Sequence, residues 1–121
     1  MRHLSTAITI AVFGLALSRQ AHAAAILYTS PVDGLEVTLN CDAVNTRSTP
    51  VAITIETYDW SGALQDSVTN SALQPGGGIS MPSPFGRYCK FKVGGPKSSV
   101  AAMAVYSSNV TGNYVTAELA R

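Results

Sequence analysis

Polar and apolar residues alternate along much of this chain, with the period of two that is typical of strands burying one face. The clearest run spans residues 35–43, where the positions expected to face inward are Leu35, Val37, Leu39, Cys41 and Ala43. A second run spans residues 88–93, with Cys89, Phe91 and Val93 inward and Tyr88, Lys90 and Lys92 outward. Both runs predict strands, and each of these strands would carry one cysteine on its buried side.

Weaker alternation and frequent turn residues predict six more strands. We place them at residues 26–29, 51–58, 63–69, 79–81, 100–106 and 114–119. The run 100–106 is apolar on both faces, which indicates a central strand or one covered on both sides. In the last run we expect Val115, Ala117 and Leu119 to face inward. Glycine and proline supply the turns, and we assign Pro82 and Pro84 to one such connection.

Short strands, Gly- and Pro-rich turns and the lack of a convincing helical segment together define the expected fold class. The sequence predicts an all-β protein, a small antiparallel β-sandwich with two packed sheets. A chain of 121 residues has room for one such domain, and we place it at residues 24–121.

The first 23 residues have the organisation of a signal peptide, which we expect to be helical and to be removed. Arg2 precedes an uncharged apolar run at residues 7–17, and Ala21-His22-Ala23 supplies the small-x-small pattern of a cleavage site. The apolar run has about 11 residues, whereas a transmembrane helix needs about 20. We therefore predict cleavage after Ala23, a periplasmic or secreted protein, and no stable membrane insertion of the mature chain.

Charged residues make up 12% of the chain, about half the fraction of an average globular protein. Residues 24–121 hold six Lys or Arg against seven Asp or Glu, a net charge of −1, which argues against a nucleic-acid partner. Both histidines, His3 and His22, belong to the predicted signal peptide. The mature chain would therefore lack the base of a Ser–His or Cys–His pair, and we expect no enzyme activity, metal or cofactor.

Cys41 and Cys89 both fall on predicted strands of the mature chain. In an oxidising compartment, two cysteines in a small domain are expected to form a structural disulfide. A redox-active pair usually keeps its cysteines close together, and a metal site needs more ligands than this pair offers. The bridge would close a loop of about 49 residues, worth about 4 kcal/mol in the chain-entropy model.

Two resemblances bear on the architecture. A cysteine in an early strand, a later tryptophan and Tyr88-Cys89 resemble an immunoglobulin domain, although the tyrosine-corner position is occupied by Arg87 and Trp60 falls in a turn. This likeness implies an immunoglobulin-like sandwich as architecture and not membership of that family.

A second resemblance covers nearly the whole mature chain and concerns small bacterial secreted proteins with one disulfide and no known activity. It rests on Leu39-Asn40-Cys41, Asn45, Ile53-Thr54-Ile55, Asp59 with Gly62, Leu73 with Pro75-Gly76, and Tyr88-Cys89-Lys90-Phe91. The resemblance implies a bacterial envelope origin and transfers no functional site.

The candidate binding surface consists of Tyr58, Trp60, Tyr88, Lys90 and Lys92. Tyr58 and Trp60 flank a predicted hairpin turn, where exposed aromatics often bind ligands, but Trp60 could instead cover one end of the core. The outward stripe of Tyr88 and two lysines could contact an acidic glycan or another polyanion, or could be a solvated face opposing Glu36 or Glu56.

These observations give three functional hypotheses. The first is a non-enzymatic interaction or structural module whose partner is an envelope protein or a glycan. The second is a carbohydrate-binding module that uses Tyr58 and Trp60. The third is a hydrolase of unfamiliar type, which would depend on Glu56 or Asp59; a carboxylate pair would need Glu56 to lie across strands from Glu36 or Asp42.

Overall fold

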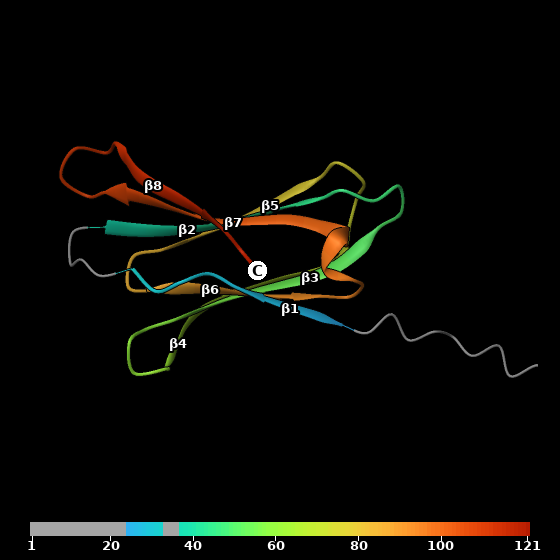
Figure 1. Ribbon diagram of the computed structural model, residues 1–121, viewed down its shortest axis with the longest axis horizontal. Helices are drawn as coiled ribbons and strands as arrows, with labels where there is room; N and C mark the ends of the chain where they lie inside the picture. Colours follow the sequence, from blue (N-terminus) through green and yellow to red (C-terminus); the bar gives the residue numbers. More distant parts are fainter. Residues whose placement is uncertain (1–23, 33–36) are drawn as a thin grey trace, which may run out of the picture.

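Eight strands form two antiparallel sheets that pack face to face, in a computed structural model that describes residues 24–32 and 37–121 (Figure 1). The strands are β1 (Ala25–Tyr28), β2 (Val37–Asn45), β3 (Val51–Tyr58), β4 (Leu64–Leu73), β5 (Gly78–Ser83), β6 (Tyr88–Val93), β7 (Val100–Ser108) and β8 (Tyr114–Leu119). A short 3-10 helix, η1 (Lys97–Ser99), precedes β7. The predicted all-β sandwich is confirmed, whereas the predicted signal peptide and its cleavage site lie outside the described residues.

The strand order divides the sequence between the two sheets. Sheet A has the order β1-β6-β3-β4 and sheet B the order β5-β2-β7-β8, so consecutive strands β2 and β3 belong to different layers. Their inward side chains form one core between the sheets. Six of the predicted inward residues of β2 and β6 are no more than 2% exposed: Leu39, Cys41, Ala43, Cys89, Phe91 and Val93. Val37 is only half-buried, and Leu35 lies outside the described part of the chain.

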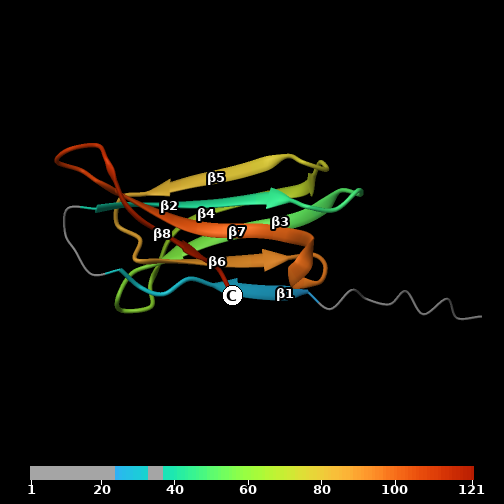
Figure 2. The ribbon, with the colours of Figure 1, turned by 45° about the horizontal axis from the view of Figure 1, so that its top comes forward.

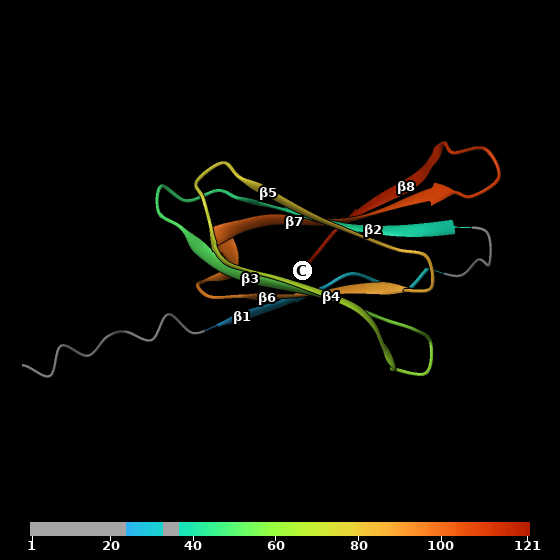
Figure 3. The same cartoon turned by 180° about the vertical axis from the view of Figure 1, so that it is seen from behind.

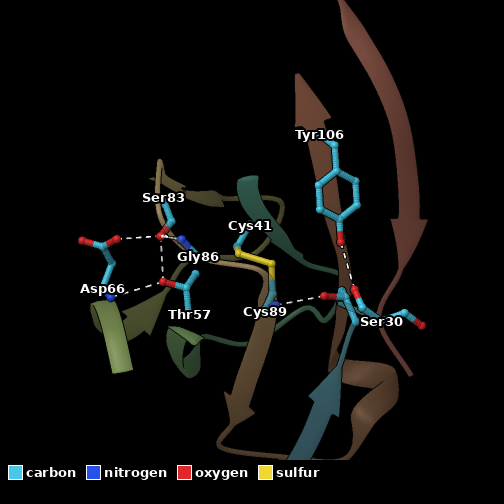
Figure 4. Close-up of a disulfide and its surroundings, with 9 residues drawn as sticks. Ser30, Cys41, Thr57, Asp66, Ser83, Gly86, Cys89 and Tyr106 are labelled. Atoms are coloured by element: carbon cyan, nitrogen blue, oxygen red, sulfur yellow. Dashed lines mark hydrogen bonds between the residues drawn. A yellow bond between two sulfur atoms is a disulfide. The ribbon is translucent and has the colours of Figure 1, made fainter. Parts of the chain in front are cut away.

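The predicted disulfide is confirmed and joins the two layers. Cys41 of β2 and Cys89 of β6 have Cα atoms 5.9 Å apart, and neither residue is exposed (Figure 4). Just past β1, the Thr29 amide donates to the Cys89 carbonyl at 3.0 Å and the Cys89 amide donates to Thr29 Oγ1 at 2.9 Å, so the pairing of β1 with β6 continues beyond Tyr28. The bridge therefore fastens an inner strand of sheet B to an inner strand of sheet A.

Strands β4 and β5 are longer than predicted. Strand β4 continues to Leu73, whose buried side chain joins the core beyond the partly buried Val68. Strand β5 includes Pro82, which we had assigned to a connection. Because β5 is hydrogen-bonded to β2 alone, the missing N–H of Pro82 costs no bond in a central ladder.

The inward face predicted for β8 is wrong. Leu119 pairs with Met103 and Ala117 with Val105, so both side chains lie on the outer face of sheet B, and Leu119 is 62% exposed. Ala120, on the opposite face, packs against the core instead. Strand β7 is an inner strand as predicted, but its outer side chains Met103 and Val105 are only partly covered. The prediction for Val115 lies outside the described side chains.

The last residues of the chain leave sheet B and reach the edge of sheet A, as the red segment shows (Figures 1 and 2). The Tyr28 amide donates to the Arg121 carbonyl at 2.9 Å, and the Arg121 amide donates to the Tyr28 carbonyl at 3.0 Å. The buried Tyr106 hydroxyl donates to the Ser30 carbonyl at 3.0 Å. These contacts join the two sheets along the side where β1 and β8 are the edge strands.

Candidate functional site

The outer face of sheet A gathers aromatic and charged side chains from three adjacent strands. Tyr88 lies opposite Tyr58, and Lys90 lies between Glu56 of β3 and Tyr28 of β1 in the register. We call this surface the tyrosine–lysine face; it consists of Tyr28, Glu56, Tyr58, Tyr88, Lys90 and Lys92. Alternation within a strand places side chains on this face, but only the pairing of β1, β6 and β3 makes them neighbours.

Tyr58 and Tyr88 are a cross-strand aromatic pair. Their ring centroids are 5.5 Å apart and their planes are inclined by 15°, which is a stacked arrangement. Such pairs contribute to sheet stability beyond the area they bury. Each ring packs on one face of the other, which restricts the motion of both side chains. The pair therefore offers a ligand fewer free ring faces than two separate tyrosines would.

Lys90 lies between two tyrosine rings. Its Nζ is 5.8 Å from the ring centroid of Tyr28 and 5.8 Å from that of Tyr58. At this distance, the negative faces of the rings attract the ammonium group. The contacts hold the lysine side chain across the face, so its charge has a defined position.

Glu56 connects the face to Lys92 and to Tyr58. Its Oε1 lies 2.5 Å from Lys92 Nζ, and its Oε2 accepts a hydrogen bond of 2.9 Å from the Tyr58 hydroxyl. The hydrogen bond from Lys92 holds the pKa of Glu56 below its usual value, against an opposing effect of desolvation. The predicted pairing of the lysines with Glu56 is therefore observed for Lys92, whereas Glu36 lies outside the described residues.

The same contacts change the ionisation of the two partners. Desolvation, followed by the hydrogen bond to Glu56, raises the pKa of the Tyr58 phenol. The hydrogen bond to Glu56 raises the pKa of the Lys92 ammonium. At neutral pH the three groups are therefore a carboxylate, a phenol and an ammonium, and the negative charge of Glu56 is balanced within the face.

Trp60 lies at the tip of the β3–β4 hairpin, whose loop projects from the sandwich (Figure 3). Asp59 organises this turn: Oδ1 accepts the amides of Ser61 at 2.8 Å and Ala63 at 3.0 Å, and Oδ2 accepts Gln65 Nε2 at 3.0 Å. Gly62 has a φ of 82°, a conformation that disfavours other residues. Trp60 is 60% exposed, so it does not cover the core.

Asp59 has its carboxylate committed to the turn. The hydrogen bond from the Ser61 hydroxyl, followed by that from the Ala63 amide, holds the pKa of Asp59 below its usual value. The Asp42 candidate for a carboxylate pair lies on β2 in sheet B, opposite Met103 and Ser80. Glu56 faces outward from sheet A, so Glu56 and Asp42 do not form the cross-strand carboxylate pair that the hydrolase hypothesis would need.

Four of the five predicted surface residues meet on one face, and Trp60 lies beyond the end of β3 that carries Tyr58. Sequence reasoning missed Tyr28, whose ring is 48% exposed beside Lys90. Tyr28 belongs to the first predicted strand, for which the sequence by itself assigns no inward face. Its contact with Lys90 could not be foreseen, because no local pattern shows that β1 pairs with β6.

No protein-family model, curated protein or solved structure matches the chain. Within residues 24–32 and 37–121, no three His, Cys, Asp or Glu side chains are grouped closely enough to hold a metal ion. The described part of the chain also holds no helix long and apolar enough to cross a membrane.

Proposed function

We propose that this chain is an exported, non-enzymatic β-sandwich that acts as an interaction module. It binds a component of the bacterial envelope through the tyrosine–lysine face together with Trp60 on the turn that follows Tyr58. The observation that carries the proposal is the ordered set of three tyrosines and two lysines on adjacent strands. Stacking, cation–π contacts and an ion pair fix these side chains before any partner arrives. A preordered surface loses less conformational entropy on binding.

Two further observations support an exported protein. A disulfide fits an extracellular or periplasmic location, because thiols are kept reduced in the cytosol. The single bridge Cys41–Cys89 also fits the small secreted proteins with one disulfide that the sequence resembles. Both points agree with the leader predicted from the sequence.

A carbohydrate-binding module is the second candidate, and Trp60 favours it. Trp60 is 60% exposed on a turn held by four hydrogen bonds to Asp59, so an aromatic side chain is accessible on an ordered turn. Aromatic rings offer apolar faces on which other groups can stack. On the tyrosine–lysine face, Tyr28 is the tyrosine with a large exposed fraction, 48%, and its ring could serve the same purpose.

Capture of partners from the envelope of the producing organism tests the proposal. We expect the wild-type protein to retain a component that Tyr58→Ala and Trp60→Ala lose. Leu119→Ser is the matched control, because Leu119 is an apolar residue on the outer face of sheet B and is 62% exposed, close to the 60% of Trp60. Circular dichroism checks that each variant is folded.

A component that all variants retain equally would contradict binding through this face. Catalytic turnover on a panel of hydrolase substrates would contradict the non-enzymatic part of the proposal. Trp60 is the single tryptophan of the chain, so its fluorescence reports directly on glycans added to the protein. An unchanged emission with every glycan would remove support from the carbohydrate-binding candidate.

A further inference from the structure

Lys90 is the lysine of the tyrosine–lysine face that has no carboxylate partner within the described residues. The Lys90 ammonium lies 5.8 Å from the ring centroids of Tyr28 and Tyr58. Glu56 is opposite Lys90 in the register and feels its charge, but the ion pair of Glu56 is with Lys92. A ring face attracts the charge but supplies no strong acceptor for the three N–H donors of an ammonium group. The Lys90 ammonium is therefore positioned and still able to bind an anion.

The charge around Lys90 favours an anionic ligand. Glu56 is the single acidic residue among the outward-facing residues described on β1, β3 and β6, and Lys92 neutralises it. The face therefore keeps one net positive charge at Lys90. An incoming carboxylate meets an attractive potential here, and its hydrogen bonds to the ammonium would be charge-assisted.

The surroundings of Lys90 favour a sugar as the carrier of that anion. The exposed Tyr28 ring lies on one side of the ammonium, and Ile26, two residues before Tyr28, is on the same face of β1. The negative face of an aromatic ring attracts the weakly positive C–H groups of a pyranose, and the phenol hydroxyl offers a hydrogen bond. A carboxylated sugar matches both the cation and the ring beside it.

We propose that Lys90, held between Tyr28 and Tyr58, binds the carboxylate of an acidic polysaccharide, and that Tyr28 packs against its sugar ring. This inference rests on the proposed function, because it names the ligand class of the same face. It assigns the recognition of charge to Lys90, while Lys92 and Glu56 keep the neighbouring side chains in place.

The test is binding to immobilised polygalacturonate, measured by biolayer interferometry. We expect Lys90→Gln to weaken binding about tenfold, the effect of losing one charge-assisted contact. Lys90→Arg should retain binding within about threefold, and Tyr28→Ala should weaken it. Lys97→Gln is the control, because Lys97 is an exposed lysine of η1 and not part of the face. Raising the salt concentration should weaken the wild-type complex.

Two other polymers separate the possible causes of binding. Methyl-esterified polygalacturonate keeps the sugar and removes the charge, so its binding should be at least about tenfold weaker. Poly-L-glutamate keeps the carboxylates and removes the sugar ring, so its binding should also be weaker.

Several results would overturn the inference: no binding of polygalacturonate, equal binding of its ester, equal binding of poly-L-glutamate, or an unchanged affinity of Lys90→Gln. The proposed function has a separate readout. If an envelope component still binds in a manner that depends on Tyr58 and Trp60, the interaction module stands and only the acidic-glycan assignment fails.

Discussion

Thr57 Oγ1 and Ser83 Oγ lie 2.8 Å apart and join sheet A to sheet B beside the disulfide (Figure 4). Ser83 Oγ donates to the Asp66 carboxylate at 2.6 Å and accepts the Gly86 amide at 3.1 Å, while Thr57 Oγ1 accepts the Asp66 amide at 3.2 Å. Because the one proton of Ser83 goes to Asp66, Thr57 must be the donor in the bond between the two hydroxyls. Three residues therefore form a closed ring of hydrogen bonds between the layers.

Gly86→Ala should destabilise the fold through this ring. A Cβ at position 86 would lie 2.6 Å from Ser83 Oγ and 2.8 Å from Thr57 Cβ, so the hydroxyls would have to move apart. Overpacking of this kind costs about 1–3 kcal/mol, and buried polar groups would also lose partners. Urea unfolding measures the change. Gly78→Ala is the control, since a Cβ there meets nothing closer than 3.7 Å; equal stabilities of the two variants would contradict the prediction.

Asn45→Asp should destabilise the opposite end of the sandwich. The buried Asn45 amide donates to the carbonyls of Thr49 at 2.9 Å and Leu73 at 2.8 Å, and its Oδ1 accepts the Arg47 amide at 2.8 Å. An aspartate supplies no donor and places a buried charge against two carbonyl oxygens, so we expect a loss of about 3 kcal/mol or more. Thermal or urea unfolding checks this value.

Asn70→Asp is the matched control for that change. Asn70 is exposed, and its side chain accepts the Ala72 amide at 3.0 Å, a bond that a carboxylate can also make. Asn70→Asp should change the free energy of unfolding by no more than about 0.5 kcal/mol. If both substitutions have similarly small effects, the Asn45 contacts do not stabilise the fold as we describe.

Loss of the disulfide should lower the free energy of unfolding by about 4 kcal/mol, the chain-entropy value for cysteines separated by 48 residues. The double variant Cys41→Ala/Cys89→Ala tests this without leaving an unpaired thiol. Comparison of its urea unfolding with that of the oxidised wild type gives the difference. A difference below about 1 kcal/mol would show that packing and the hydroxyl ring hold the sheets together without the bridge.

Lowering the pH should reduce the free energy of unfolding over the pH range in which Glu56 takes up a proton. The pKa of Glu56 is lowered from its ordinary 4.5 in the folded state, so the unfolded chain takes up the proton first as pH falls. The stabilisation is therefore complete above pH 4.5 and is lost as pH decreases through the folded-state pKa. The charged and titratable groups that face Glu56 are Lys92, Lys90 and Tyr58.

Urea unfolding at neutral pH and at several values below 4.5 tests this dependence. Glu56→Gln should be less stable at neutral pH and should lose less stability in acid than the wild type. Some acid dependence should remain, because the pKa of Asp59 is also lowered, from an ordinary 3.8. Identical slopes for the two proteins would place the acid sensitivity elsewhere.

Local patterns in the sequence predicted the strands well because strand direction is a local property. Alternate side chains of an extended chain point to opposite sides, so the inward cysteines of β2 and β6 could be assigned without knowing the partners of either strand. The turn at Asp59 and Gly62 was equally local, since their side-chain and backbone preferences act within four residues. The exposure of Trp60 on that turn is not a local property. It depends on whether the packed sheets leave an end of the core open for the indole to cover.

The sequence by itself determined which segments form strands and that two cysteines allow a single intrachain pairing. It also determined the outward direction of Tyr58, Tyr88, Lys90 and Lys92. Only the tertiary structure decided which strands are neighbours, because pairing depends on backbone groups that every residue shares. That choice turned Leu119 outward by pairing it with Met103, and it brought Tyr28 beside Lys90 by pairing β1 with β6. The candidate site is thus a product of register, which places side chains from distant parts of the chain on one face.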